Sequence, residues 1–258
     1  MDDMAIGFVL YNPTEKTLER IRICIANSYK VYVFDNTPDA TFFKDELKKN
    51  KGIQYHTLDK NVGLGISISM ITVAAFYDNF TYLLFFDQDT IFNLDTLSFI
   101  GDFYKNNVEK LPNCAAISFQ ENGTNLGAEH VQLAINSGSL FVLEELKTIG
   151  WHDMSYFVDG VDYKFCLDAS KKGFNIYKVG NVPGFDHSSE QDEEELGVFG
   201  YKLKVRSYPL FRIRDYVKAL TRLCILSIAS FKFSFFFRFS KQLFLFVIMQ
   251  FVSRVMRL

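Results

Sequence analysis

The stretch Tyr82-Leu83-Leu84-Phe85-Phe86-Asp87-Gln88-Asp89-Thr90 organises the interpretation of the whole sequence. Its first five residues are apolar or aromatic, which predicts a strand that is buried on both faces of a parallel sheet. Asp87 and Asp89 follow directly at the carboxyl end of that strand, which is where open α/β sheets bind their ligands. Residues two apart on an extended chain point to the same side, so both carboxylates can face one ligand.

Two neighbouring carboxylates repel each other, and a divalent cation relieves that repulsion. Mg²⁺ in particular is held by one or two carboxylates together with phosphate oxygens. Asp87 and Asp89 are therefore candidates for a metal and phosphate site. The alternative is an exposed turn that carries two acids, because Asp is common in turns.

Short apolar segments alternate with helix-like segments before this stretch. Strands are expected at residues 5–10, 31–34 and 53–58. The first helix is expected to start at Asn12-Pro13, because Asn12 can cap and Pro13 suits the first helical position. Another helix is expected from the Asn61-Val62-Gly63 turn to about residue 77. This alternation predicts a parallel sheet with right-handed crossovers.

The chain after Thr90 continues with helices and strands up to about residue 187. Helices are expected at residues 94–106 and from the segment 157–162 to about residue 172, with Asp159 as a candidate cap. Strands are expected at residues 115–119, 131–135, 140–142 and 174–179. The length of 258 residues supports one substantial α/β domain or two small ones.

Charge is distributed unevenly along the chain. The formal net charge is −2, but residues 200–258 contain 12 basic residues and one acid, so this tail carries +11 and the remainder −13. The four cysteines lie far apart, which indicates buried thiols in a reducing compartment. The acidic start Met1-Asp2-Asp3-Met4 does not have the pattern of a secretory signal. These features together predict a cytoplasmic protein whose tail meets a polyanion.

The tail, residues 208–258, is rich in phenylalanine as well as in basic residues, and is expected to form a helical segment separate from a catalytic domain at residues 1–207. Its apolar runs at 223–231 and 243–249 are each shorter than the roughly 20 residues that cross a bilayer. We therefore expect an in-plane helix on the inner face of an anionic membrane. The alternative is a helix that packs on the body or at a homo-oligomer interface. No nucleic-acid-binding module pattern is present.

Several short motifs follow one another between residues 5 and 187. They are Val31-Tyr32-Val33-Phe34-Asp35-Asn36, Asn61-Val62-Gly63, Phe86-Asp87-Gln88-Asp89-Thr90, Asn136-Ser137-Gly138-Ser139, Phe157-Val158-Asp159-Gly160-Val161-Asp162 and His187. In this order and spacing the chain resembles family-2 glycosyltransferases of the GT-A fold, most closely the bacterial rhamnosyltransferase-like branch that builds surface polysaccharides. The resemblance implies an α/β fold with a mostly parallel sheet flanked by helices.

The resemblance also implies a donor site. The residues that would bind the nucleotide sugar are Asp35, Asn61, Gly63, Asp87 and Gln88. The residues that would hold Mg²⁺ or Mn²⁺ are Asp89, Asp87 and His187.

The resemblance implies an acceptor side as well. Ser137 and Gly138 would line it, and Asp162 would be the catalytic base, with Asp159 as the second candidate. The implied reaction moves a sugar, with rhamnose as a candidate, to a hydroxyl of a lipid-linked or polysaccharide acceptor with inversion. A positioned carboxylate is needed because the attacking hydroxyl loses its proton.

Three features depart from the family pattern. The first is the segment His187-Ser188-Ser189-Glu190, which in the family commonly ends in glycine. The other two are single positions. The family usually carries an acid where Lys164 stands and an arginine where Asp168 stands. These departures leave open a non-catalytic, membrane-bound sugar-binding or scaffold subunit. A nucleotidyltransferase is the other alternative, but it needs a Gly-rich phosphate loop that Tyr11-Asn12-Pro13-Thr14 does not supply.

Overall fold

The computed structural model of the protein describes residues 3–38, 43–123, 127–187, 194–198, 201–205 and 207–255. These residues belong to two compact units, Met1–Ser188 and Ser189–Leu258. The predicted boundary between residues 207 and 208 lies inside the second unit, after a β-hairpin. Each unit is described by itself.

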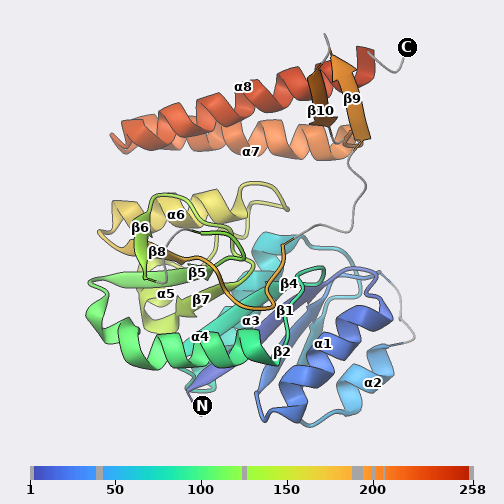
Figure 1. The fold of residues 1–258 in the computed structure, drawn as a ribbon, viewed down its shortest axis with the longest axis vertical. Coiled ribbons are helices and arrows are strands. Elements are labelled where there is room, and N and C mark those ends of the chain that lie inside the picture. The colour runs from blue at the N-terminus through green and yellow to red at the C-terminus, as the bar shows by residue number, and fades with distance from the viewer. Residues whose placement is uncertain are drawn as a thin grey trace. The chain divides into compact units, whose positions relative to one another are not determined.

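The first unit is built on an eight-stranded sheet (Figure 1). The strands are β1 Met4–Leu10, β2 Val31–Asp35, β3 Ile53–Thr57, β4 Tyr82–Asp87, β5 Cys114–Phe119, β6 Glu129–Val131, β7 Ser139–Val142 and β8 Asn175–Val179. Their order is β3-β2-β1-β4-β7-β5-β8-β6. β7 runs antiparallel to β4 and β5, β6 runs antiparallel to β8, and the other pairs are parallel. The predicted α/β fold with a mostly parallel sheet is confirmed.

Helices cover both faces of this sheet (Figure 1). They are α1 Glu15–Ala26, α2 Lys44–Lys49, α3 Leu64–Tyr77, α4 Leu94–Asn107, α5 Leu143–Ile149 and α6 Val161–Lys171, with a 3₁₀ turn at Val108–Lys110. Alternate residues of β1 serve the two faces. Ile6 and Phe8 belong to a core shared with α1 and α4, whereas an added Cβ on Gly7 would meet Ile71 of α3. Burial on both faces is the reason why the strands read as continuous apolar runs.

Two local predictions in this unit are wrong. The first helix is capped by Thr14, which forms a reciprocal capping box with Thr17, and Asn12 instead adopts a positive φ of 48° outside the helix. The strand expected at residues 131–135 has only Val131 in β6, and the following residues form a loop that leads to β7. Both errors come from local signals that tertiary contacts override. Asn12, for example, donates its backbone N–H to the Thr37 hydroxyl at 2.8 Å.

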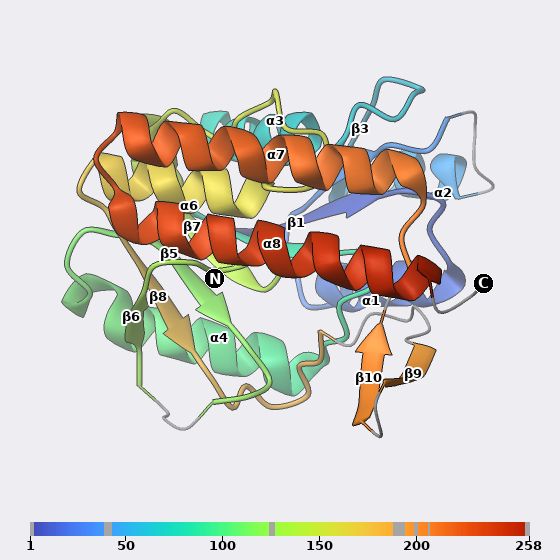
Figure 2. The same ribbon diagram turned by 90° about the horizontal axis from the view of Figure 1, so that it is seen from above.

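The second unit contains a β-hairpin and two long helices (Figure 2). Its elements are the antiparallel strands β9 Glu194–Val198 and β10 Tyr201–Val205, and the helices α7 Leu210–Ala229 and α8 Phe233–Val255. α7 and α8 lie antiparallel, since Cys224 meets Ser240 at 3.5 Å near one end and Tyr216 stacks on Phe246 at 3.9 Å further along.

The length of α8 corrects one expectation. The apolar runs of the tail were predicted to be too short to cross a bilayer, but α8 is one continuous helix. Its segment Phe233–Arg254 has 22 residues and a mean hydropathy of 1.4, which by length and composition alone is enough for a membrane span. Within the described residues it is the one helix that meets this criterion.

Candidate active site

Two of the predicted donor residues, Asp35 and Asp87, end the strands that lie on either side of β1. β1 lies between β2 and β4, and the register places Leu10 beside Asp35 and Val9 beside Asp87. The carboxyl ends of these strands therefore meet, as expected for a ligand site in an open α/β sheet. A further bridge between Ile91 and Asp186 brings the segment before His187 to the same edge.

Ser137 holds the segment that carries Asp87 and Asp89 through two contacts. The Ser137 hydroxyl accepts the backbone N–H of Asp87 at 2.8 Å and lies 2.5 Å from the hydroxyl of Thr90. Gly138 donates its backbone N–H to the Phe85 carbonyl at 2.7 Å. Ser137 and Gly138, predicted on the acceptor side, are buried here and support the end of β4.

Gln88 fastens the same loop to the end of β1. Its side-chain carbonyl accepts the backbone N–H of Tyr11 at 2.8 Å, and its side-chain amide donates to the Tyr11 carbonyl at 3.0 Å. The backbone carbonyl of Gln88 accepts a hydrogen bond from the Arg20 guanidinium at 2.6 Å. Gln88 was predicted to bind the nucleotide sugar. In the structure its side-chain amide bonds to the Tyr11 backbone and so orders the loop between Asp87 and Asp89.

Asp87 and Asp162 form the electrostatic centre of the site, although 75 positions separate them in the sequence. Burial raises the pKa of Asp87 to about 8, and the negative charges of Asp162 and Asp89 add to the shift. Burial likewise raises the pKa of Asp162 to about 7, with a contribution from the charge of Asp159. A hydrogen bond from the Asn136 backbone opposes the rise at Asp162. The structure thus brings the predicted metal carboxylates and both candidate bases into one acidic cluster.

Helix α6 presents Asp162 in its first turn. Gly160, with a positive φ of 81°, is the N-cap residue and has no side-chain cap, so Asp159 does not cap the helix as the alternative reading expected. A carboxylate in the first turn of a helix is favoured by the helix dipole in its charged form. The helix therefore favours the charged form of Asp162, whereas burial and the acidic neighbours favour its protonated form.

His187 presents a nitrogen suited to a metal or a ligand. Its Nε2 atom is buried and makes no hydrogen bond within the part of the chain that the structure describes. Burial lowers the pKa of His187, against the opposing influence of the Phe119 backbone and of the charge of Asp89. A neutral imidazole with an unshared lone pair is the form that binds metals.

The described residues do not supply a complete metal site. Among them, no three His, Cys, Asp or Glu side chains lie close enough together to hold an ion by themselves. The donor set nevertheless suits Mg²⁺ or Mn²⁺, because such ions take one or two carboxylates and complete their shell with phosphate oxygens and water. Asp89 fits this pattern, and the Nε2 of His187 would add a nitrogen ligand to it.

Asp35, which was predicted to bind the nucleotide sugar, is almost entirely buried, with 2% of its surface exposed. One of its carboxylate oxygens accepts the Thr37 backbone N–H at 2.9 Å, and the other accepts the Tyr55 hydroxyl at 2.8 Å. The Asp35 carboxylate therefore fixes the backbone after β2 through Thr37 and ties β2 to β3 through Tyr55.

Asn61 and Gly63 form the predicted turn into α3. The Asn61 side chain accepts the Gly63 backbone N–H at 2.9 Å, and Gly63 has a positive φ of 85°. An added Cβ on Gly63 would overlap the Phe157 carbonyl, and the Leu64 backbone N–H donates to that same carbonyl at 2.5 Å. This close backbone contact joins the donor-side turn to the loop that leads to Asp159 and Asp162.

The sequence did not predict the support that Asn136 and His152 give to Asp162. His152 is fully buried, and its Nε2 lies 3.3 Å from the side-chain carbonyl of Asn136. The His152 ring stacks on Phe165 of α6 at 4.9 Å between centroids. Asn136 is the first residue of the quoted Asn136-Ser137-Gly138-Ser139 motif and could have been found, whereas nothing in the sequence around His152 distinguishes it.

Lys164 and Asp168, the two single-residue departures from the family pattern, form an ion pair with each other. Lys164 contacts Asp168 one turn later on α6, and it also lies 3.4 Å from Asp153. Compared with the family pattern, the acidic and the basic residue have exchanged positions 164 and 168. The attraction between residues four apart on a helix is kept.

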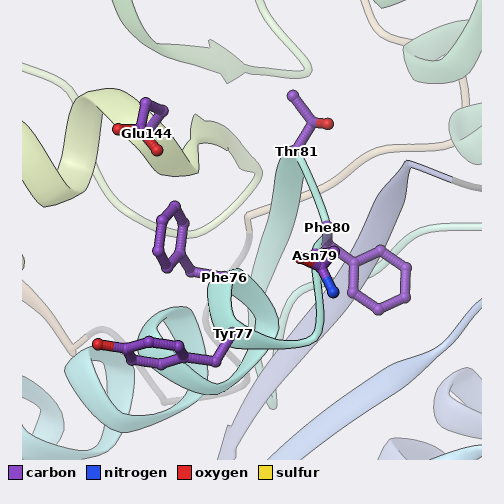
Figure 3. A pocket seen from close by; sticks show the side chains of 6 residues that line it. All are labelled: Phe76, Tyr77, Asn79, Phe80, Thr81 and Glu144. Atoms are coloured by element: carbon purple, nitrogen blue, oxygen red, sulfur yellow. The ribbon is translucent and has the colours of Figure 1, made fainter.

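A surface pocket of about 350 Å³ lies elsewhere on the first unit (Figure 3). Its lining residues are Phe76, Tyr77, Asn79, Phe80, Thr81 and Glu144. They surround the end of α3 and the start of β4, whereas the acidic cluster follows the opposite, carboxyl end of β4. The pocket is therefore separate from the proposed donor site.

No family model matches the sequence, and no curated protein matches it. Solved structures with the same fold were found. S. aureus TarS (residues 1–349) aligns with a TM-score of 0.52 at 15% identity, over 71% of this chain and 59% of that chain. GalNAc-T7 with UDP, GalNAc and Mn²⁺ aligns with a TM-score of 0.54 at 11% identity, over 73% of this chain and 45% of that chain.

A third structure, S. aureus TarS (residues 1–349) in complex with UDP-GlcNAc, aligns with a TM-score of 0.51 at 14% identity, over 86% of this chain and 66% of that chain. The chain spans less than two thirds of the protein chain in each of these three structures. At such low identity the shared property is the fold. The sheet order, the flanking helices and these alignments together show that residues of the first unit adopt the GT-A fold.

Proposed function

We propose that this protein is a glycosyltransferase that uses a nucleotide-sugar donor and a divalent metal. The observation that carries the proposal is the convergence of Asp87 and Asp89, at the end of β4, with Asp162, at the start of α6. Two solved structures of the same fold contain UDP or UDP-GlcNAc, and one of them contains Mn²⁺. The resemblance of the Asp-Gln-Asp stretch adds rhamnose as a candidate sugar.

Asp162 is the proposed general base. Its pKa of about 7 lies close to neutral pH, where a base combines availability with proton affinity. Asp162 would accept the proton of the acceptor hydroxyl while that oxygen bonds to the anomeric carbon. The bond between that carbon and the diphosphate breaks on the opposite face, so the configuration inverts.

Asp89 and the Nε2 of His187 would hold the metal, with phosphate oxygens of the donor and water in its remaining positions, and Asp87 would lie beside them. The metal supplies charge stabilisation to the departing diphosphate as a Lewis acid. The chain itself orders these groups: Ser137 and Gln88 fix the loop, and the bridge to Asp186 places His187. Asp35, Asn61 and Gly63 would shape the nucleoside side of the donor site.

The acceptor is proposed to be a hydroxyl of a lipid-linked or polysaccharide substrate at the inner membrane face. The basic, phenylalanine-rich second unit supports this part of the proposal. The two alternatives make different products. A nucleotidyltransferase would release pyrophosphate, and a non-catalytic sugar-binding subunit would leave the donor intact.

The test begins with a thermal-shift screen of nucleotide sugars with and without Mn²⁺. The best nucleoside diphosphate is then titrated by calorimetry into the wild type, Asp89→Asn and Asp95→Asn, where Asp95 is an exposed acid of α4 and serves as the matched control. We expect Asp89→Asn to lose the Mn²⁺-dependent part of binding and Asp95→Asn to keep it. An unchanged affinity in Asp89→Asn would contradict the proposed metal site.

A further inference from the structure

Helix α8 has two faces of different character. One face packs inward: Phe235 and Phe239 are buried, and Phe246 stacks on Tyr216 of α7. The opposite face is exposed and apolar. Its members are Phe233, Phe237, Phe244, Val247, Ile248 and Phe251, each with 40–68% of its surface exposed. At about 100° per residue these six positions fall within roughly 100° of the helix circumference.

We infer that this exposed face of α8, hereafter the α8 stripe, docks in the plane of an anionic membrane. A continuous apolar stripe along several turns is an interaction surface and not the scattered exposure that is normal for a folded protein. Exposed basic side chains accompany it on the same helix, Arg238 and Lys241, and α7 adds exposed Arg214 and Lys218 to the same unit. Apolar groups with basic groups beside them match a bilayer surface with anionic headgroups.

The pairing of the two helices decides between an in-plane and a spanning arrangement. α7 runs along α8 from the contact between Cys224 and Ser240 to its own first residues. Just before α7, the Tyr208 backbone N–H donates to the side chain of Gln250 on α8. α7 also contains five charged residues, which are Arg212, Arg214, Asp215, Lys218 and Arg222. If α8 crossed the bilayer with its partner, these charges would enter the hydrocarbon layer, which is costly. The α8 stripe therefore lies along the membrane surface, although α8 alone is long and apolar enough to cross it.

Vesicle flotation tests the docking surface. The full chain is mixed with vesicles of phosphatidylcholine alone or of equal parts phosphatidylcholine and phosphatidylglycerol. We expect binding to the anionic vesicles. The triple variant Phe237→Ser, Phe244→Ser, Phe251→Ser should bind at least about 100-fold more weakly at low and high salt, since buried phenylalanine contributes independently of salt.

Two further variants separate the causes. Arg238→Gln with Lys241→Gln should weaken binding about 30-fold at low salt and much less at high salt, because screening already removes their contribution there. The matched control replaces three exposed apolar residues of the first unit, Leu58, Tyr77 and Leu94, with serine. This control should bind like the wild type, and equal loss in the control would overturn the assignment to α8.

Depth measurements distinguish in-plane docking from a membrane span. The only tryptophan, Trp151, is replaced by phenylalanine, and single tryptophans are introduced as Phe233→Trp, Phe244→Trp or Phe251→Trp. Quenching by brominated lipids should report a similar shallow depth for all three. A deep middle position with shallow ends would overturn the in-plane arrangement. A dimer in solution that the serine triple variant dissociates would instead assign the α8 stripe to a second copy of the chain.

Discussion

Asp87 and Asp162 keep protons that unfolded aspartates would already have lost. Burial and the neighbouring acids raise the pKa of Asp87 from 3.8 to about 8, so between those values the folded state binds more protons than the unfolded state. The contribution of this proton to the free energy of unfolding is therefore fully present below about pH 4. It is lost as the pH rises towards 8. We expect the Tm of the ligand-free protein to drop by about 5 °C or more between pH 5 and pH 8, measured by scanning fluorimetry.

The variant Asp87→Asn isolates this effect. It keeps the shape of the side chain and removes its proton affinity, so the slope of Tm against pH should flatten. Asp95→Asn, which removes an exposed acid from α4, should leave the slope unchanged. If Asp87→Asn keeps the full slope, Asp87 does not carry the buried proton.

Asp162→Asn tests the proposed base. The amide cannot take the acceptor proton, and general-base catalysis typically contributes about 10²–10⁴-fold. We expect transfer to fall by at least about 10²-fold while calorimetric affinity for the donor survives. Asp159→Asn is the matched comparison, because it removes a neighbouring charge without removing the proposed base. If Asp159→Asn abolishes transfer and Asp162→Asn does not, the base is Asp159.

Part of this site could be predicted from sequence because its residues follow recognisable strand ends. Asp87 and Asp89 came from the apolar run of β4, and Asp162 from a motif resemblance. What sequence could not give is which partner each polar side chain chooses. The Gln88 amide satisfies the backbone of Tyr11, 77 positions earlier, and Asp35 is enclosed by Thr37 and Tyr55. Such pairings depend on the tertiary arrangement.

At the scale of elements, the contact between the start of α3 and the loop at Phe157 couples the donor and acceptor sides. Gly63 permits it through its positive φ and its missing Cβ. Gly63→Ala adds both backbone strain and overlap with the Phe157 carbonyl. Gly173 also has a positive φ, of 81°, but an added Cβ there meets nothing within 4 Å.

The pair of glycine variants therefore separates the two costs. We expect Gly173→Ala to lower the free energy of unfolding by about 1 kcal/mol, from strain alone. Gly63→Ala should lower it by at least about 1 kcal/mol more, because the backbone contact must also open. Chemical denaturation measures both. Equal losses would show that the Phe157 contact contributes nothing to stability.

The boundaries of elements show where local signals fail. α3 and α4 were predicted almost to the residue because long apolar patterns and a clear turn define them. The start of α1 was misplaced, since Asn12 and Thr14 are both good caps and only the contact of Asn12 with Thr37 decides between them. The alternating residues at 131–135 imitate a strand, but only Val131 finds a ladder partner on β8.

At the scale of the whole molecule, all proposed donor, metal and base residues belong to the unit Met1–Ser188. That unit has its own core, formed by the sheet with α1, α2 and α4. The second unit contains twelve of the large apolar side chains that the structure leaves exposed, including the α8 stripe. Catalysis and membrane docking are thus assigned to different parts of the chain.

A chain truncated after Ser207 tests this division of labour. It retains every proposed site residue and loses α7 and α8, so it should unfold cooperatively and bind the nucleoside diphosphate with Mn²⁺ as the full chain does. It should no longer float with anionic vesicles, because the α8 stripe and its basic neighbours are gone. Circular dichroism, calorimetry and flotation measure the three properties. A truncated chain that fails to fold would mean that α7 and α8 complete the core of the catalytic unit, and their phenylalanines would then have to be assigned to packing within the protein.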